Sequence, residues 1–225
     1  MDESPTSRSG YVAIAGKPNV GKSTLLNAFL GQKIAAVTFR PQTTRQQQLG
    51  ILTRDNCQAI FIDTPGIHSP HHKLGEQMNA EVLSALEDAD LVLVLLDASQ
   101  PPDDDDRRLA KALAEHAPRR ARLVVLNKID QSTDESLTAN TSLYRELFPE
   151  GELVLISARR GDGLEALATR IFEMLPEGDP FFPPDQLTDL YEREIAADLI
   201  REAALLLLRA EVPHGIAVRI DQFTE

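Results

Sequence analysis

The chain has 225 residues, enough for one full domain with an appendage or for two small domains. Hydrophobic residues make up 42% and charged residues 26%, a globular composition that excludes a wholly disordered chain. The net charge is −12. This acidity argues against non-specific nucleic-acid binding, because phosphates repel an acidic surface.

The single cysteine, Cys57, excludes an intramolecular disulfide and a cysteine-based metal site, and it predicts a cytoplasmic protein. The longest apolar runs, 91–96 and 203–208, have six residues each, whereas a membrane span needs about 20. The polar start lacks the apolar stretch of a signal peptide. We therefore expect residues 1–9 to be a disordered tail, and we expect no stable membrane insertion.

Short apolar segments alternate with helix-length segments, a pattern that predicts parallel βαβ units. Strands are expected at 11–15, 46–52, 58–63, 91–96, 122–126 and 153–156. Helices are expected at 22–30, 74–87, 103–116, 134–147 and 164–175, with a long loop at 31–45. The predicted fold class is α/β: a doubly wound, mostly parallel sheet over residues 10–175.

A proline-rich segment follows this domain. Residues 176–185 contain four prolines, and helices do not pass through such a segment, so 176–186 is predicted to be a linker. Beyond it, 187–209 predicts one amphipathic helix and 216–220 a strand. A lone helix and strand bury little core, so we expect 187–225 to begin a second domain that is incomplete here.

A phosphate-binding pattern, G-x-x-x-x-G-K-[ST], spans residues 16–23 between a predicted strand and a predicted helix. Backbone N–H groups of such a loop and the helix N-terminus bind phosphate. We expect Lys22 to reach the β- and γ-phosphates and Ser23 to ligate Mg²⁺. The alternative is an accidental glycine-rich turn. The predicted phosphate site comprises Gly16, Lys17, Pro18, Asn19, Val20, Gly21, Lys22, Ser23 and Thr24.

A second motif, Asp63-Thr64-Pro65-Gly66, ends the strand predicted at 58–63. An Asp there can hold Mg²⁺ through water, and the Gly66 N–H can bond a γ-phosphate oxygen. Alone, this pattern is equally well explained by a strand-ending turn. After a P-loop it indicates a γ-phosphate sensor.

The loops around these motifs contain further candidates. Thr43 and Thr44 can ligate Mg²⁺ while the γ-phosphate is present, or they are loop residues without a ligand. His68, His71 and His72 favour a solvated loop over a metal site. The acidic run at 103–106 follows two prolines and fits a helix N-terminus better than a metal site.

A third motif, Asn127-Lys128-Ile129-Asp130, follows the strand predicted at 122–126. The Asp130 carboxylate can accept hydrogen bonds from guanine N1–H and the 2-amino group, which adenine lacks, a discrimination of about 10⁴–10⁵. The Asn127 amide can serve O6 and N7, and the Lys128 stem can pack on the base. The alternative is a helix start capped by Asp130. A backbone N–H for O6 is expected from Ser157, Ala158 or Arg159.

With these motifs the chain resembles the translation-factor-like P-loop GTPases, the TrmE-Era-EngA-like group, and within them the Era family. The resemblance is carried by 16–23 with Pro-Asn-Val inside the loop, by Gln-Thr-Thr-Arg at 42–45, and by the motifs at 63–66, 127–130 and 157–158. It implies a Mg²⁺-dependent GTPase that acts as a nucleotide switch in small ribosomal subunit assembly. It also implies 16S rRNA as a partner and a peripheral place at the inner membrane, although the sequence offers no basic amphipathic surface. We expect a monomer.

The same resemblance makes 187–225 the opening of a C-terminal KH domain. The Gly-x-x-Gly loop by which KH domains clamp RNA is not in this sequence. RNA binding is therefore implied by the resemblance alone.

The catalytic candidates are Lys22, Thr44 and Asn19. Ras-like enzymes orient the attacking water with a Gln directly after Asp-x-x-Gly, but here the residue is Ile67, so we predict slow hydrolysis, on the order of 10⁻⁴–10⁻² s⁻¹. In related GTPases an Asn at the place of Asn19 helps bind K⁺; alternatively it is a polar loop residue. Two functions stay open: a slow GTPase, or a nucleotide-gated RNA- or ribosome-binding module whose hydrolysis is incidental. A third function, ATP hydrolysis, stays open only if Asp130 does not select guanine.

Overall fold

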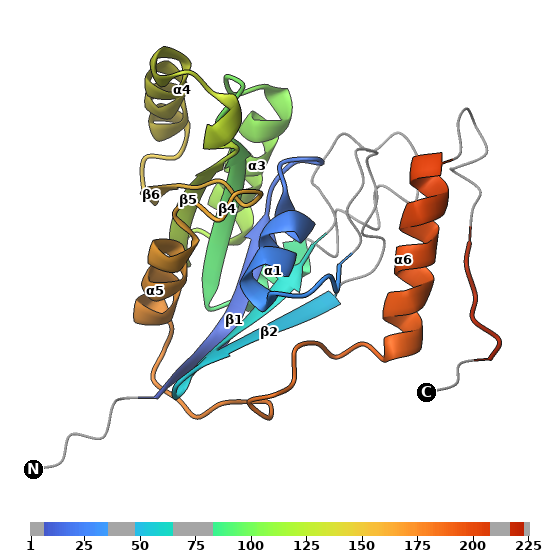
Figure 1. Ribbon diagram of the computed structural model, residues 1–225. Coiled ribbons are helices and arrows are strands. Elements are labelled where there is room, and N and C mark those ends of the chain that lie inside the picture. The colour runs from blue at the N-terminus through green and yellow to red at the C-terminus, as the bar shows by residue number, and fades with distance from the viewer. Residues whose placement is uncertain (1–6, 36–47, 65–82, 208–216, 223–225) are drawn as a thin grey trace, which may run out of the picture.

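The computed structural model describes residues 7–35, 48–64, 83–207 and 217–222, and the main body of the molecule is one sheet with helices on both faces (Figure 1). The strands are β1 (Arg8–Ala15), β2 (Gln48–Arg54), β3 (Cys57–Asp63), β4 (Leu91–Asp97), β5 (Ala121–Asn127) and β6 (Glu152–Leu155). The helices are α1 (Lys22–Leu30), α3 (Asp104–His116), α4 (Asp134–Leu147), α5 (Leu164–Met174) and α6 (Glu192–Leu207), with a 3₁₀ turn η1 at Ile129–Gln131.

The strand order is β2-β3-β1-β4-β5-β6, and every neighbouring pair is parallel except β2 with β3. From the central pair β1 and β4, the chain winds outward in both directions. In such a sheet, ligands bind beyond the carboxyl ends of the strands, where the winding direction reverses. The predicted α/β doubly wound fold is confirmed, and its switch point lies directly at the predicted phosphate loop.

Two hydrophobic layers hold the helices on the sheet. Leu93 and Leu95 of β4 face one layer, which contains α1 and α5, while Val92 and Val94 face the other, which contains α3 and α4. All seven residues of β4 are buried, as the continuous apolar run predicted. Side chains alternate across a strand, so this one strand supplies core to both faces.

Most predicted boundaries hold within two residues. The helices predicted at 22–30 and 134–147 have the same bounds as α1 and α4. Of the helix expected at 74–87, the structure describes residues 83–87, and these are helical together with residue 88. The hairpin is tighter than expected, because β2 continues to Arg54 and pairs with Cys57, and Asp55 takes the positive φ of 51° that such a short turn requires. Most of the long loop expected at 31–45 lies outside the described residues.

The first strand begins before the predicted domain boundary at residue 10. β1 starts at Arg8, and the Ser9 N–H donates to the Pro176 carbonyl at 3.1 Å. The Gly178 N–H donates to the Ser7 carbonyl at 3.0 Å. Arg8 and Ser9 therefore belong to the sheet, where we had expected tail, and Ser7 is bonded to the linker, which supplies backbone partners to this segment.

The predicted linker is bonded to the sheet. The side chain of Gln58 on β3 is fully buried and holds the backbone of Phe181 and Phe182. Farther on, the Leu187 carbonyl accepts from the Ile51 N–H of β2 at 2.8 Å. The division into domains at 175 and 187 stays a prediction, but residues 176–189 follow the sheet closely.

Two predictions for the C-terminal region were wrong. The helix expected from 187 begins only at Glu192, because Leu187 and Thr188 pair with β2 instead. Residues 217–220 form no strand in the described structure, where no neighbouring strand pairs with them; residue 216 lies outside it. The buried Glu202 of α6 pairs with Lys33, in the segment after α1, at 2.7 Å. No helix within the described ranges is long and apolar enough to span a membrane.

Candidate nucleotide site

The predicted phosphate loop connects the carboxyl end of β1 to the start of α1. Gly21 stands at the N-cap of α1 with a φ of 105°, and Asn19 also has a positive φ, of 64°. Glycine adopts such angles without strain, and Asn tolerates them better than most residues. A Cβ at Gly21 would also collide with the side-chain amide of Asn127. The loop is thus bent tightly enough to turn its N–H groups and the α1 N-terminus toward an anion.

Lys22 lies inside this loop. Its Nζ donates to the carbonyls of Gly16 and Lys17, each at 3.2 Å. Burial lowers the pKa of Lys22 to about 8, and the nearby Asp63 carboxylate opposes this shift. A phosphate oxygen can replace these weak carbonyl contacts with a full opposite charge.

The end of β3 brings two oxygen-bearing side chains beside α1. Ser23 Oγ donates to Asp63 Oδ2 at 3.0 Å. Thr64 Oγ1 donates to the Ile14 carbonyl at 2.8 Å, which fixes the end of β3 against β1. Asp63 and Thr64 are fully buried. A hydroxyl and a carboxylate in contact are hard oxygen donors of the kind Mg²⁺ takes, so the residues present fit this metal.

Several predicted site residues lie outside the described residues. They are Thr43, Thr44, Pro65, Gly66 and Ile67, and likewise His68, His71 and His72. Within the described part of the chain, no cluster of three His, Cys, Asp or Glu residues could hold a metal ion.

Asn127, at the end of β5, ties together the loops of the site. Its Nδ2 donates to the Val20 carbonyl at 2.8 Å, and its Oδ1 accepts the Ala158 N–H at 2.9 Å. An amide nitrogen carries two N–H groups, so one remains for a purine acceptor. Asn127 is therefore first a cross-link between the phosphate loop and the base motif, a role that the sequence did not indicate.

Asp130 lies in η1, with one carboxylate oxygen engaged. Ser157 Oγ donates to Asp130 Oδ1 at 2.7 Å. The alternative prediction, that Asp130 caps a helix, was wrong: α4 is capped by Thr133, whose hydroxyl accepts the Ser136 N–H at 3.2 Å. A carboxylate accepts up to about four hydrogen bonds, so Asp130 keeps the capacity for a purine edge.

The segment after β6 was expected to supply a backbone N–H to a purine oxygen. The Ser157 N–H donates to the Asp162 carbonyl at 3.0 Å, and the Ala158 N–H is bonded to Asn127. Of the three residues predicted, Arg159 is the one whose N–H has no such bond among the described contacts. A purine contact from residues 157–159 stays a prediction.

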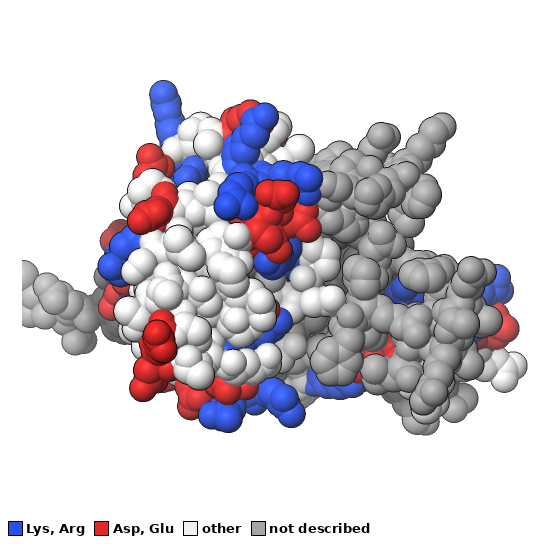
Figure 2. Space-filling model, turned by 90° about the horizontal axis from the view of Figure 1, so that it is seen from above, with Lys and Arg blue, Asp and Glu red and all other residues white. Residues whose placement is uncertain are grey.

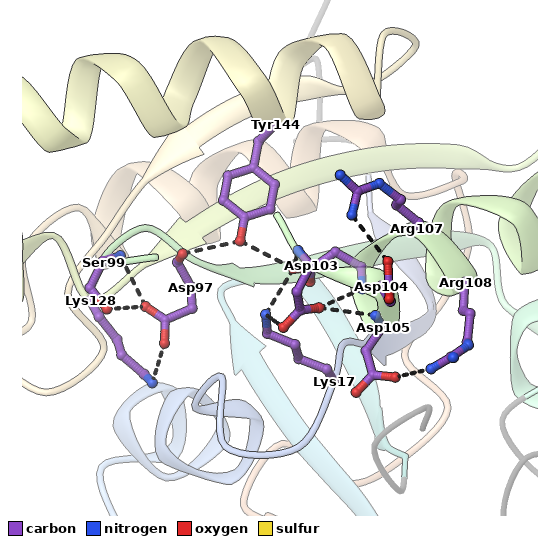
Figure 3. A network of polar contacts seen from close by, with 11 residues as sticks. Lys17, Asp97, Ser99, Asp103, Asp104, Asp105, Arg107, Arg108, Lys128 and Tyr144 are labelled. Atoms are coloured by element: carbon purple, nitrogen blue, oxygen red, sulfur yellow. Dashed lines mark hydrogen bonds and ion pairs between the residues drawn. The ribbon is translucent and has the colours of Figure 1, made fainter. Parts of the chain in front are cut away.

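A polar network around Lys17 and Lys128 was missed (Figure 3). Lys17 Nζ bonds Asp103 Oδ2 at 2.7 Å and Asp106 Oδ2 at 2.8 Å, and Lys128 Nζ bonds Asp97 Oδ2 at 2.6 Å. Burial would lower the pKa of Lys17, but the hydrogen bonds to both carboxylates outweigh it and raise that pKa. The acidic run correctly predicted a helix start, with Asp103 as the N-cap of α3. Its spacing did not reveal that Asp106 turns inward.

The described part of the face seen from above, in Figure 2, carries basic and acidic side chains in mixed clusters around a large uncharged area. It offers no extended basic surface among the described residues on that face.

Comparisons with known proteins agree with this geometry. A family model described as 50S ribosome-binding GTPase matches residues 11–128. The GTPase Era of Clostridium botulinum (strain Langeland) is 46% identical over 215 residues, which cover 96% of this chain and 72% of that protein. The GTPase Era of Ectopseudomonas mendocina is 44% identical, with 100% of this chain and 75% of that protein covered.

Two solved structures are similar over most of the chain. An Era bound to MgGDPNP and nucleotides 1506–1542 of 16S ribosomal RNA has a TM-score of 0.83 and 40% identity, covering 92% of this chain and 70% of its own. A variant of Aquifex aeolicus Era bound to GDP and AlF4⁻ has a TM-score of 0.83 and 41% identity, with the same coverage.

Proposed function

The chain belongs to the Era family of GTPases, and from this premise we propose that it binds GTP, hydrolyses it slowly to GDP and phosphate, and switches between two nucleotide states. The observation that carries the proposal is the Asn127–Val20 hydrogen bond of 2.8 Å, which joins motifs 107 residues apart. This bond holds the phosphate loop next to the base motif at 127–130. A phosphate group and a guanine base of one nucleotide could therefore be bound at the same site.

Guanine selection is assigned to Asp130. Ser157 orients the carboxylate through one oxygen, and the two oxygens together keep the capacity to accept the guanine N1–H and 2-amino group. An adenine would leave a partly buried acceptor without a donor, which is the costly mismatch that separates the purines. This argument favours GTP over the ATPase alternative.

For phosphate and metal, Lys22, Ser23 and Asp63 carry the proposal. Lys22 would neutralise the β- and γ-phosphates, while Ser23 would ligate Mg²⁺ directly and Asp63 through water. Mg²⁺, when bound, supplies positive charge that offsets the negative charge on the phosphates. Thr44 would complete the metal site, and Gly66 would sense the γ-phosphate. The relative bound to MgGDPNP supports this metal.

Slow hydrolysis follows from Ile67. In hydrolysis, water attacks the γ-phosphorus and the bond to the bridging oxygen of GDP breaks, so a side chain that orients the water speeds the reaction. The Ile67 side chain has no group that can hydrogen-bond to water. We therefore propose an intrinsic rate on the order of 10⁻⁴–10⁻² s⁻¹.

Asn19 is proposed to help hold K⁺ beside the β- and γ-phosphates, where a cation adds charge that an arginine would otherwise supply. Its left-handed backbone, with a φ of 64°, places it at the turn of the loop. Faster turnover in KCl than in NaCl, lost in Asn19→Ala, is expected. Equal turnover in both salts would reduce Asn19 to a polar loop residue.

We propose small ribosomal subunit assembly as the setting. The family description names the 50S subunit, but it rests on residues 11–128, whereas a relative similar over 92% of this chain holds 16S rRNA. The RNA contact would belong to the C-terminal region, which we propose to be of KH type.

The decisive experiment measures phosphate release by purified protein with GTP and Mg²⁺. Slow release that vanishes in Lys22→Ala supports the GTPase. Undetectable release with intact GTP affinity would support the alternative, a nucleotide-gated module. Binding of neither GTP nor GDP by the wild type would overturn both.

A further inference from the structure

Lys17 is part of the phosphate loop, but its side chain points away from the loop toward α3 (Figure 3). Its ammonium is bonded to Asp103 and Asp106, and the side chain is only 13% exposed. Two carboxylates around one ammonium leave a net negative charge at this place. Such a charge would oppose a phosphate there, so Lys17 serves as a tether for the loop.

Asp106 is the buried end of this tether. Its side chain has no exposed surface, and its Oδ2 accepts from Lys17 Nζ, from the Asp103 N–H at 3.0 Å and from the Tyr144 hydroxyl at 3.3 Å. Burial raises the pKa of Asp106, and the bond to Lys17 opposes this rise. A fully buried carboxylate with one lysine partner is sensitive to the loss of any of these contacts.

Tyr144, on α4, carries the network to the other half of the site. Its ring is fully buried, and its single hydroxyl proton can be donated either to Asp106 Oδ2 at 3.3 Å or to the Asp97 carbonyl at 3.2 Å. The Asp97 side chain in turn holds Lys128 Nζ through Oδ2 at 2.6 Å and the Ser99 hydroxyl through Oδ1 at 2.6 Å. Figure 3 shows Tyr144 between the Lys17 and Lys128 ends.

We propose that Asp106 and Tyr144 are positioning residues of the nucleotide site, which set the spacing between the phosphate loop and the base motif through the chain Lys17–Asp106–Tyr144–Asp97–Lys128. This inference rests on the proposed function. A guanine nucleotide spans both motifs, so its affinity depends on that spacing, whereas a ligand that occupies the base motif alone does not depend on it.

The test compares Asp106→Asn and Tyr144→Phe with the wild type and with Asp104→Asn. Asp104 belongs to the same acidic run, but its side chain is 83% exposed and pairs only with Arg107 among the described contacts. Each protein is checked for cooperative thermal unfolding. Displacement of a fluorescent GDP analogue then gives affinities for GDP and for guanosine.

We expect GDP affinity to fall about tenfold or more in Asp106→Asn, which loses the short charge-assisted bond to Lys17, and about threefold in Tyr144→Phe, which loses only the longer hydroxyl contacts of 3.2 and 3.3 Å. Guanosine affinity should change less than about twofold in both, and Asp104→Asn should behave as the wild type. Because the residues act in one chain, the double variant should lose less than the product of the single losses.

Wild-type GDP affinity in folded Tyr144→Phe and Asp106→Asn would overturn the inference. A parallel fall for GDP and guanosine would also overturn it, since that result indicates general loosening of the fold. If Asp106→Asn does not fold, Tyr144→Phe decides, because it keeps the buried ring. Failure of the proposed function looks different: the wild type would bind GDP no better than Lys22→Ala.

Discussion

Replacing Gln58 with Ala should release the linker from the sheet. Gln58 is fully buried on β3, and its Oε1 accepts the N–H groups of Phe181 and Phe182 at 2.9 Å each. Its Nε2 donates to the Phe182 carbonyl at 2.9 Å and to Thr53 Oγ1 at 3.0 Å. Three of these bonds hold the linker. At about 1 kcal/mol net each, they stabilise its docked state by about 3 kcal/mol.

Hydrogen exchange measures this effect directly. A loss of about 3 kcal/mol should speed amide exchange at residues 181 and 182 about 100-fold, because exchange there needs only local opening. Gln186→Ala is the matched control: its Nε2 makes one bond, to the Thr188 carbonyl at 3.0 Å, so exchange at 181 and 182 should stay near the wild-type rate. Equal exchange at these amides in Gln58→Ala and wild type would refute the reasoning.

The remaining predictions concern the nucleotide site. Asp130→Asn should weaken GDP binding at least about 100-fold and favour xanthosine diphosphate in competition assays; an unchanged purine preference would remove guanine reading from this residue. Lys22 has a pKa of about 8, and a bound phosphate raises this pKa, so GDP binds with uptake of a proton. GDP affinity, measured by calorimetry, should therefore fall about fourfold from pH 7 to pH 8.5. An arginine side chain is always charged, so Lys22→Arg should lose this pH dependence. The same pH profile in both proteins would contradict the prediction. Gly21→Ala places a methyl group against the Asn127 amide at a φ of 105° and should lower the free energy of unfolding by more than about 1 kcal/mol. Gly178→Ala is the control, because a Cβ there meets nothing within 4 Å and should not lower that free energy. Equal melting temperatures for the two variants would contradict the prediction.

The fold was predictable wherever local pattern and burial agree. The continuous apolar run at 91–96 predicted a strand buried on both faces, and it forms most of β4. The acidic run at 103–106 predicted a helix start, and Asp103 is the N-cap of α3. The C-terminal region was harder, because Leu187 and Thr188 fit a helical pattern equally well. Their place beside β2 depends on a tertiary contact, the Ile51–Leu187 hydrogen bond, which overrides local propensity.

For the site, the sequence indicated which motifs matter but not how they are joined. Spacing alone predicted the places of Lys22, Ser23 and Asp63. The cross-links of Asn127 and the inward turn of Asp106 link residues far apart in the chain, and no local pattern encodes those contacts. Lys17 was predicted to belong to the loop, yet its anchoring role required knowing where α3 begins in space.

The pairing of residues 187–189 with β2 has a practical consequence for dividing the molecule. Ile51 donates to the Leu187 carbonyl at 2.8 Å, and the Leu49 N–H donates to Asp189 Oδ1 at 3.1 Å. These contacts shield the outermost strand, whose bare amides would otherwise recruit strands from other molecules. A fragment cut at 175 would therefore be prone to aggregation, whereas one extended through 190 would keep its own protective cover.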